Sequence, residues 1–209
     1  YNRDIIPTTW FDNGFAFYGT MGDFNWNVTL TGDLNGDAIA DGIRSARMKG
    51  VSSTVTDWTK TLQFSWVGME GLKVGGSMTM NNAPTSAVDE SIEHTWEYVD
   101  TDNDDIADNW QDVITEITAV EVSEVGVFLT EFNATYSANN MYARMEYGMI
   151  DYTDNPAGVE SSSGYYLDLG YDIGSLIGCD DANLYLWTRM SEYRKNDDND
   201  PTEILLFGV

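Results

Sequence analysis

The sequence is short of several residue types, and each shortage excludes a class of protein. It has one cysteine, Cys179, so no disulfide can form within the chain, and one histidine, His94, far from Cys179. No apolar run reaches eighteen residues, which excludes a transmembrane helix. Ten basic residues face 35 acidic ones, and the formal net charge of −25 argues against a nucleic-acid partner.

Signals for processing and catalysis are also missing. Residue Tyr1 is not an initiator methionine and no signal peptide is present, so we expect a mature, truncated or partial chain. The sequence contains neither a Gly-x-Ser-x-Gly motif nor a phosphate-binding loop, and His94 has no nucleophile beside it. We therefore predict that the protein is not an enzyme.

Alternation of apolar and polar residues is the strongest pattern present. Between residues 140 and 151, methionines and other apolar residues at odd positions alternate with Tyr142, Arg144, Glu146 and Gly148. A period of two is typical of a β-strand with one apolar and one polar face. Similar patterns predict strands at 14–19, 24–31, 62–66, 72–80, 91–99, 113–122, 124–136, 165–173, 184–191 and 203–209. The predicted fold class is all-β and antiparallel.

The region from 81 to 122 interrupts this succession. Residues 91–99 and 113–122 flank an acidic centre and are expected to pair as a hairpin. The positions of Trp110, Ile114 and Ile117 also fit helical spacing, but the β-branched content favours a strand. We interpret residues 1–209 as a single β domain that carries this hairpin as an insertion.

The lengths of the connections alternate along the chain. Those at 19–23, 68–71, 137–140 and 174–183 are shorter than most of those at 33–54, 81–122, 151–163 and 195–202, which hold 21 of the 35 acidic residues. In an up-and-down sheet, alternate connections lie at the same end. Short turns at one end and long loops at the other are typical of an outer-membrane barrel. In such a barrel the apolar side of each strand faces lipid and the polar side faces the water-filled interior. The pattern predicts an antiparallel up-and-down transmembrane β-barrel.

Four short motifs are spread over most of the chain: Pro7-Thr-Thr-Trp10 with Gly14, Ile43-Arg-Ser-Ala-Arg-Met-Lys-Gly50, Gly164-Tyr-Tyr-Leu-Asp-Leu-Gly-Tyr171 and Leu186-Trp-Thr-Arg189-Met-Ser-Glu192. Together they resemble motifs of the phosphate-selective porins of Gram-negative outer membranes. The resemblance implies a barrel of about sixteen strands in outer-membrane lipid, usually trimeric, which passes small solutes or ions. It also implies that the long acidic loops face outside and that these residues form part of a longer barrel.

The resemblance also suggests which side chains line the pore. The basic residues Arg44, Arg47 and Lys49 match the family's basic patch. Further candidates on the polar faces of strands are Lys73, Arg144, Glu146, Asp168 and Arg189. Phosphate selection in the family depends on many basic groups in the pore, and such groups are scarce in this sequence. The resemblance therefore implies that the protein conducts solutes, but it does not imply selection of phosphate. A carboxylate pair of Glu146 and Asp168 is expected to line the pore, not to catalyse.

Two acidic loops have the ligand spacing of calcium sites. They place oxygen ligands at the first, third, fifth and ninth positions and a backbone carbonyl at the seventh, as in thrombospondin type 3 repeats and dockerins. The predicted ligands are Asp33, Asn35, Asp37, Ile39 and Asp41 in one loop and Asp100, Asp102, Asp104, Ile106 and Asp108 in the other. Arg44 and Gln111 stand where a bidentate acid is usual, which predicts a weak Ca²⁺ affinity of roughly 10⁻⁴–10⁻³ M. Solvated acidic loops are the alternative.

A second interpretation of the whole chain remains open. A secreted or surface-attached β-sandwich could use the calcium loops to bind partners or sugars, as an adhesion module. Its solubility without detergent would separate it from a barrel.

Overall fold

The structure is a computed structural model that describes residues 11–86, 91–99, 109–117, 123–178 and 184–209. The chain divides into two compact units, residues 1–84 with 124–209, and residues 85–123. Among the described residues, no helix has the length and apolar character needed to cross a membrane.

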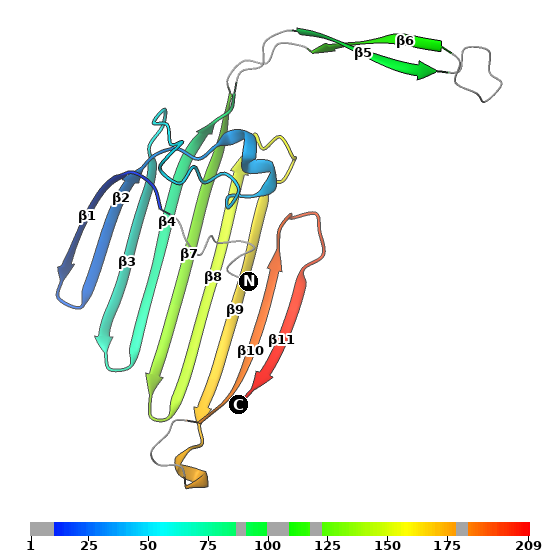
Figure 1. Ribbon diagram of the computed structural model, residues 1–209. Helices are drawn as coiled ribbons and strands as arrows, with labels where there is room; N and C mark the ends of the chain where they lie inside the picture. Colours follow the sequence, from blue (N-terminus) through cyan, green and yellow to red (C-terminus); the bar gives the residue numbers. More distant parts are fainter. Residues whose placement is uncertain (1–10, 87–90, 100–108, 118–122, 179–183) are drawn as a thin grey trace. The chain divides into compact units, whose positions relative to one another are not determined.

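Nine strands of the first unit form one sheet, in which each strand pairs antiparallel with its neighbour (Figure 1). In sheet order these strands are β1 (Gly14–Met21), β2 (Phe24–Thr31), β3 (Thr59–Met69), β4 (Leu72–Pro84), β7 (Glu124–Ala138), β8 (Met141–Thr153), β9 (Ser161–Asp172), β10 (Tyr185–Arg194) and β11 (Thr202–Gly208). This arrangement confirms the predicted all-β, antiparallel fold class.

The second unit contains a hairpin of β5 (Ser91–Val99) and β6 (Asn109–Ile117). The strand interpretation of this region is thus confirmed, although β6 begins at Asn109 and not at Val113. Residues 118–122 lie outside the described part of the chain. The cross-strand pair Tyr98 and Trp110, whose ring centroids are 5.2 Å apart, extends the pairing beyond the predicted start.

Connections of the large sheet are largely sorted by length, as the sequence predicts, except that the β9–β10 connection is longer than 154–160 and 195–201 (Figure 1). At one end, residues 22–23, 70–71 and 139–140 make tight turns, and a longer connection contains the 3-10 helix η2 (Ser175–Ile177). Both Asn139 and Asn140 have positive φ, 54° and 61°, which is the conformation of a two-residue type I′ hairpin turn. The opposite end carries the connections 32–58, 154–160 and 195–201 and both ends of the 85–123 insertion.

Cross-strand register gives the sheet two chemically different faces. Asp168 lies between Arg144 and Arg189 in one row, whereas Leu167 lies between Met145 and Met190 in the next row. Directly paired residues share a face, so the first row belongs to a polar face and the second to an apolar face. The predicted separation of methionines from charged residues in β8 is confirmed.

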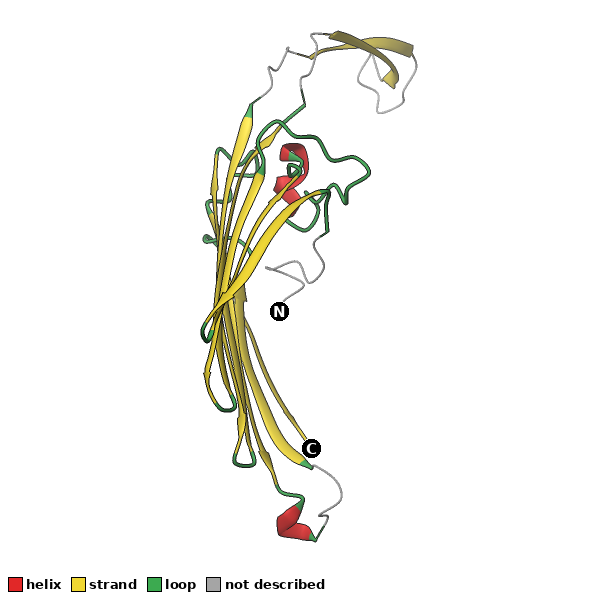
Figure 2. Ribbon diagram, turned by 90° about the vertical axis from the view of Figure 1, so that its left-hand side faces the viewer, coloured by secondary structure: helices red, strands yellow, loops and turns green. Residues whose placement is uncertain are grey.

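The connection between β2 and β3, residues 32–58, folds back over the polar face of the sheet, near the end that carries the long connections (Figure 2). We call it the covering segment. It contains the 3-10 helix η1 (Gly36–Asp41), which lies on the concave side of the sheet. A Cβ at Gly36 would lie 2.6 Å from the Ala83 carbonyl oxygen, so this position needs glycine to let the backbones approach. The buried core under this covering segment comprises Leu34, Ile39, Ile43, Ala46, Ala83, Val125, Val127, Leu129 and Ile150.

This core explains why the alternation of β7 is less clean in the sequence. The polar-face residues Val125, Val127 and Leu129 are apolar and buried, because the covering segment packs on them. Farther along the strand, Glu131 and Asn133 occupy the same face where nothing in the core covers it. The polar face therefore has a covered apolar zone and an open polar zone.

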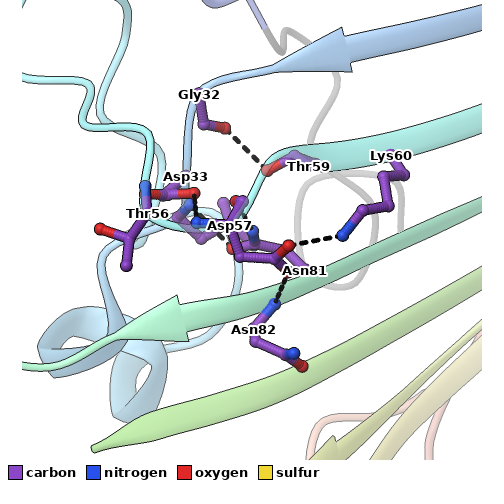
Figure 3. A network of polar contacts seen from close by, with 9 residues as sticks. Gly32, Asp33, Thr56, Asp57, Thr59, Lys60, Asn81 and Asn82 are labelled. Atoms are coloured by element: carbon purple, nitrogen blue, oxygen red, sulfur yellow. Dashed lines mark hydrogen bonds and ion pairs between the residues drawn. The ribbon is translucent and has the colours of Figure 1, made fainter.

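Hydrogen bonds of Asp33 and Asn81 hold the covering segment on the sheet (Figure 3). The buried Asp33 carboxylate accepts from the Thr56 amide at 2.5 Å and the Asp57 amide at 3.0 Å. Asn81 of β4 accepts from the Leu34 amide at 3.0 Å and donates to the Asp57 carbonyl at 2.8 Å. Together they join both ends of the segment to β4.

Asp57 adds an ion pair to this network. Its carboxylate accepts from the Lys60 ammonium at 2.6 Å and from the Asn82 amide at 3.1 Å (Figure 3). The Lys60 side chain, followed by the Asn82 amide, lowers the pKa of the Asp57 carboxyl despite partial burial. The carboxylate thus stays ionised at neutral pH and keeps the start of β3 joined to β4.

We predict that Asp33→Ala loosens the covering segment, because the Thr56 and Asp57 amides lose the buried carboxylate that accepts from them. The cost should be about 2–3 kcal/mol, equivalent to roughly 30- to 150-fold faster hydrogen exchange at Thr56 and Asp57. Asp198→Ala removes the same charge from another connection and should leave these amides unchanged. Equal exchange in wild type and Asp33→Ala would contradict this role of Asp33.

Candidate functional site

A group of charged and aromatic side chains occupies the open part of the polar face. Arg144 comes from β8, Asp168 from β9 and Arg189 from β10, and register places them in one row. In the adjacent row, Glu146 of β8 lies opposite Tyr166 of β9. We call these five residues the polar cluster. Its members come from three neighbouring strands because alternate residues of each strand point to this face.

The centre of the polar cluster is a bidentate ion pair. Arg189 donates from Nε to Asp168 Oδ1 at 2.5 Å and from Nη2 to Asp168 Oδ2 at 2.6 Å. Asp168 is only 8% exposed, while the Arg189 side chain is 40% exposed. The geometry matches the fork of a guanidinium to the two carboxylate oxygens, which fixes both side chains.

Tyr166 connects this ion pair to the second carboxylate. Its hydroxyl donates to Glu146 Oε2 at 2.9 Å, and its ring lies beneath the guanidinium carbons of Arg189 at 4.9 Å and Arg144 at 5.5 Å. Arg144 Nη2 in turn lies 3.7 Å from Glu146 Oε2. The two arginines and two carboxylates therefore share one aromatic ring, and their charges balance locally.

A cavity of about 410 Å³ adjoins the polar cluster toward the tight-turn end. It is lined by Tyr142, Asp168, Gly170, Tyr185, Trp187 and Arg189. Gly170 lies between Tyr142 and Trp187 in the cross-strand row. The site thus combines three aromatic side chains with one fixed guanidinium–carboxylate pair, a combination that can hold a polar solute by stacking and hydrogen bonding.

The structure brings together four of the eight pore-lining candidates, namely Arg144, Glu146, Asp168 and Arg189. Lys73 lies on the same face but on β4, where it lines a separate cavity of about 250 Å³ with asparagines of β2 and β7. The remaining three belong to the covering segment.

Each residue of that basic patch has a different setting. Arg44 lines a cavity of about 420 Å³ between η1 and the strands β8 and β9. The Arg47 Nε donates to the Arg44 carbonyl at 2.9 Å, and Lys49 is exposed with a φ of 59°. All three lie on the connection between β2 and β3, whereas the polar cluster lies on β8, β9 and β10.

Oxygens of the first predicted calcium loop have partners within the protein. Asp33 accepts from backbone amides, Asn35 accepts from the Asp37 amide as the cap of η1, and the Ile39 carbonyl accepts from the Gly42 amide. No group of three acidic, histidine or cysteine side chains able to hold a metal ion occurs among the described residues. Calcium at 33–41 stays a prediction. The second loop, from Asp100 to Asp108, lies outside the described residues.

Sequence reasoning missed the aromatic members of this site. Tyr142, Tyr166 and Trp187 alternate with apolar residues and so share the face of Arg144, Asp168 and Arg189. The sequence does contain a signal for them, because each is an aromatic residue at a position where the alternation predicts a polar one. The alternation places Tyr142 on the polar side of its strand, but the pore-lining prediction names charged residues only.

Comparisons of the chain with models of known protein families, with curated proteins and with solved structures gave no match. The function of the site must therefore be inferred from its own chemistry.

We predict that Arg189→Gln costs about 1–3 kcal/mol of unfolding free energy, because Asp168 keeps its buried charge and loses its bidentate partner. The double variant Asp168→Asn with Arg189→Gln should recover part of this loss, since no buried charge remains. Urea unfolding of the wild type, Asp168→Asn, Arg189→Gln and the double variant measures the coupling. Arg194→Gln, the same change at the end of β10, is the control, and strictly additive losses would contradict the pairing.

Proposed function

We propose that the nine-stranded sheet is part of the wall of a porin-like channel in an outer membrane, through which small solutes or ions diffuse. The apolar face carries the proposal, because it exposes large hydrophobic side chains on all nine strands. These include Phe15, Phe17, Met21, Phe24, Trp26, Leu62, Phe64, Met78, Met80, Phe128, Phe132, Met141, Met145, Tyr147, Tyr165, Leu169, Tyr171, Leu186, Met190, Leu205 and Phe207.

An apolar surface of this extent needs a cover. Monomeric soluble proteins rarely expose contiguous apolar patches larger than a few hundred Å². The buried core of the sheet lies on the opposite, polar face, under the covering segment. The other described sheet has two strands, which are too few to cover nine. Lipid is a cover that nine exposed strands can share.

The sorting of connections supports lipid over a second protein layer. Three tight turns lie at one end of the sheet together with the β9–β10 connection, and the two longest connections, between β2 and β3 and between β4 and β7, lie at the acidic other end. Outer-membrane barrels have short periplasmic turns and long extracellular loops. We therefore place the acidic connections outside the cell, and the polar cluster on the water-filled side of the wall.

Closure of the wall needs more strands than the nine described here. β1 and β11 are the two edges of this sheet. The resemblance to phosphate-selective porins supplies the remainder of the proposal, a barrel of about sixteen strands that assembles as a trimer. The balanced polar cluster and the net charge of −25 do not favour phosphate as the solute.

Cysteine labelling tests the orientation of the two faces. In a protein whose native Cys179 is replaced by serine, Arg144→Cys should react with a small water-soluble thiol reagent and Met145→Cys should not. The comparison is well matched because the Arg144 side chain is 45% exposed and Met145 is 37% exposed in the protein itself. Protection at 145 would therefore come from lipid.

The measurement uses the intact protein in native outer membranes. Equal labelling at 144 and 145, or extraction without detergent, would contradict the channel and favour a surface β-sandwich. Discrete ion conductance of the purified protein in a planar bilayer is the functional readout.

For the loop from Asp100 to Asp108 we retain the proposal of a weak calcium site, which its ligand spacing supports. Five carboxylates within nine residues, four of them at predicted ligand positions, repel one another unless a cation lies among them. Millimolar calcium on a site of this class should stabilise the bound loop by about 1 kcal/mol. Chelation should therefore increase proteolytic cleavage between Asp89 and Glu121 and leave the nine-stranded sheet protected.

A matched pair of variants identifies the ligands. Asp102→Asn with Asp104→Asn should abolish the effect of calcium, while Asp198→Asn with Asp200→Asn removes the same charge elsewhere and should preserve it. If calcium does not change the cleavage of the wild type, the calcium proposal is wrong and the segment is a solvated acidic loop.

A further inference from the structure

We propose that the cavity formed by Tyr142, Gly170, Tyr185 and Trp187 beside the Asp168–Arg189 pair is a binding site for a neutral saccharide. This site goes beyond the proposed channel, because binding in detergent solution does not require a closed barrel. The two ideas can fail separately.

The walls of the cavity suit a ring with one apolar face. A pyranose presents C–H groups on the faces of its ring and hydroxyls around its rim. Three aromatic side chains line the cavity, which offers flat apolar surfaces for those C–H groups. The volume of about 410 Å³ lies within the range of small-molecule sites and is sufficient for one or two sugar rings.

The charged end of the cavity suits hydroxyl groups. Asp168 accepts two N–H groups of Arg189, and a guanidinium has five. A hydroxyl both donates and accepts, so it can bond the remaining lone pairs of the carboxylate and the remaining N–H groups of the guanidinium together. The bidentate pair holds both partners in place before a ligand arrives, which reduces the ordering cost of binding.

Local charge argues against ionic ligands. The cavity lining pairs one guanidinium with one carboxylate, Arg189 with Asp168, so the lining itself has no net charge to attract an ion. A further carboxylate on this face, Asp172 opposite Tyr185, accepts from the backbone amides of Gly174 and Leu184. The chain's net charge of −25 further repels anions. A cation would meet two guanidinium groups nearby. A neutral, hydroxyl-rich ring is the ligand class that uses both the aromatic walls and the paired charges.

Substitution of Gly170 tests the cavity most directly, because it can fill the space without removing a lining side chain. An added Cβ would have ordinary contacts, 3.4 Å to Tyr185 Cδ1 and 3.6 Å to the Cβ atoms of Trp187 and Tyr142. Alanine therefore fits, while the two methyl groups of valine would project among the three aromatic side chains. Gly170→Val fills the cavity and leaves every aromatic and charged lining residue unchanged.

The experiment measures binding of glucose, maltose and cellobiose to the intact protein by titration calorimetry and saturation-transfer NMR. The detergent must contain no sugar headgroup, so an amine-oxide detergent is used. We expect saturable binding that weakens about tenfold or more in Trp187→Ala and Gly170→Val. Leu186→Ala, the neighbouring residue on the apolar face, should bind as wild type does.

Two measurements keep the result interpretable. Circular dichroism and thermal unfolding identify variants that fail to fold, and Gly170→Ala is a milder filling variant if valine disturbs β9. Absence of saturable sugar binding to the folded wild type would overturn the proposal. So would sugar affinity that survives in both Trp187→Ala and Gly170→Val, or a site that binds tetramethylammonium, adenosine or inorganic phosphate in preference to all three sugars.

Discussion

The register of antiparallel pairing is the constraint on which both faces of the sheet depend. A shift of one residue between β8 and β9 would exchange every side chain between faces. Asp168 would then lie opposite Met145 or Ala143 in place of Arg144, and a carboxylate would enter the apolar surface. The ion pair with Arg189 adds the same restriction between β9 and β10. Charged residues on the polar face thus specify the register as well as the site.

Where the covering segment packs on the polar face, the residues of that face must be apolar. Under the covering segment, the face needs valine, leucine and isoleucine, and the buried part of the segment's backbone, around Asp33 and Leu34, needs hydrogen-bond partners within the protein. Asp33 and Asn81 meet this need from opposite sides of the contact. Beyond the segment the same face is open, and the polar cluster and its cavity occupy it. The position of the covering segment therefore sets where the site can be.

Much of this fold follows from the sequence, because a period of two and the turn residues are local signals. Strand identity, antiparallel order and the separation of Met145 from Arg144 were predictable on that basis. The inward packing of residues 33–58 was not predicted, although Leu34, Ile39 and Ile43 are large apolar residues within this connection. The ligand spacing of the aspartates also did not predict that Asp33 accepts from backbone amides of the same segment. Which side chains converge across strands depends on register, which single-strand patterns leave open.

In the proposed channel, the distribution of charge separates selection by charge from recognition of neutral solutes. The acidic excess lies mainly in the connections at one end, whereas the polar cluster balances two guanidinium groups with two carboxylates. A field of one sign at an entrance raises the local concentration of cations and lowers that of anions. A balanced wall does not add to this selection, and it leaves aromatic surface and paired hydrogen-bonding groups to distinguish solutes by shape. Selection by charge would thus occur at the entrance, and recognition of neutral solutes on β8, β9 and β10.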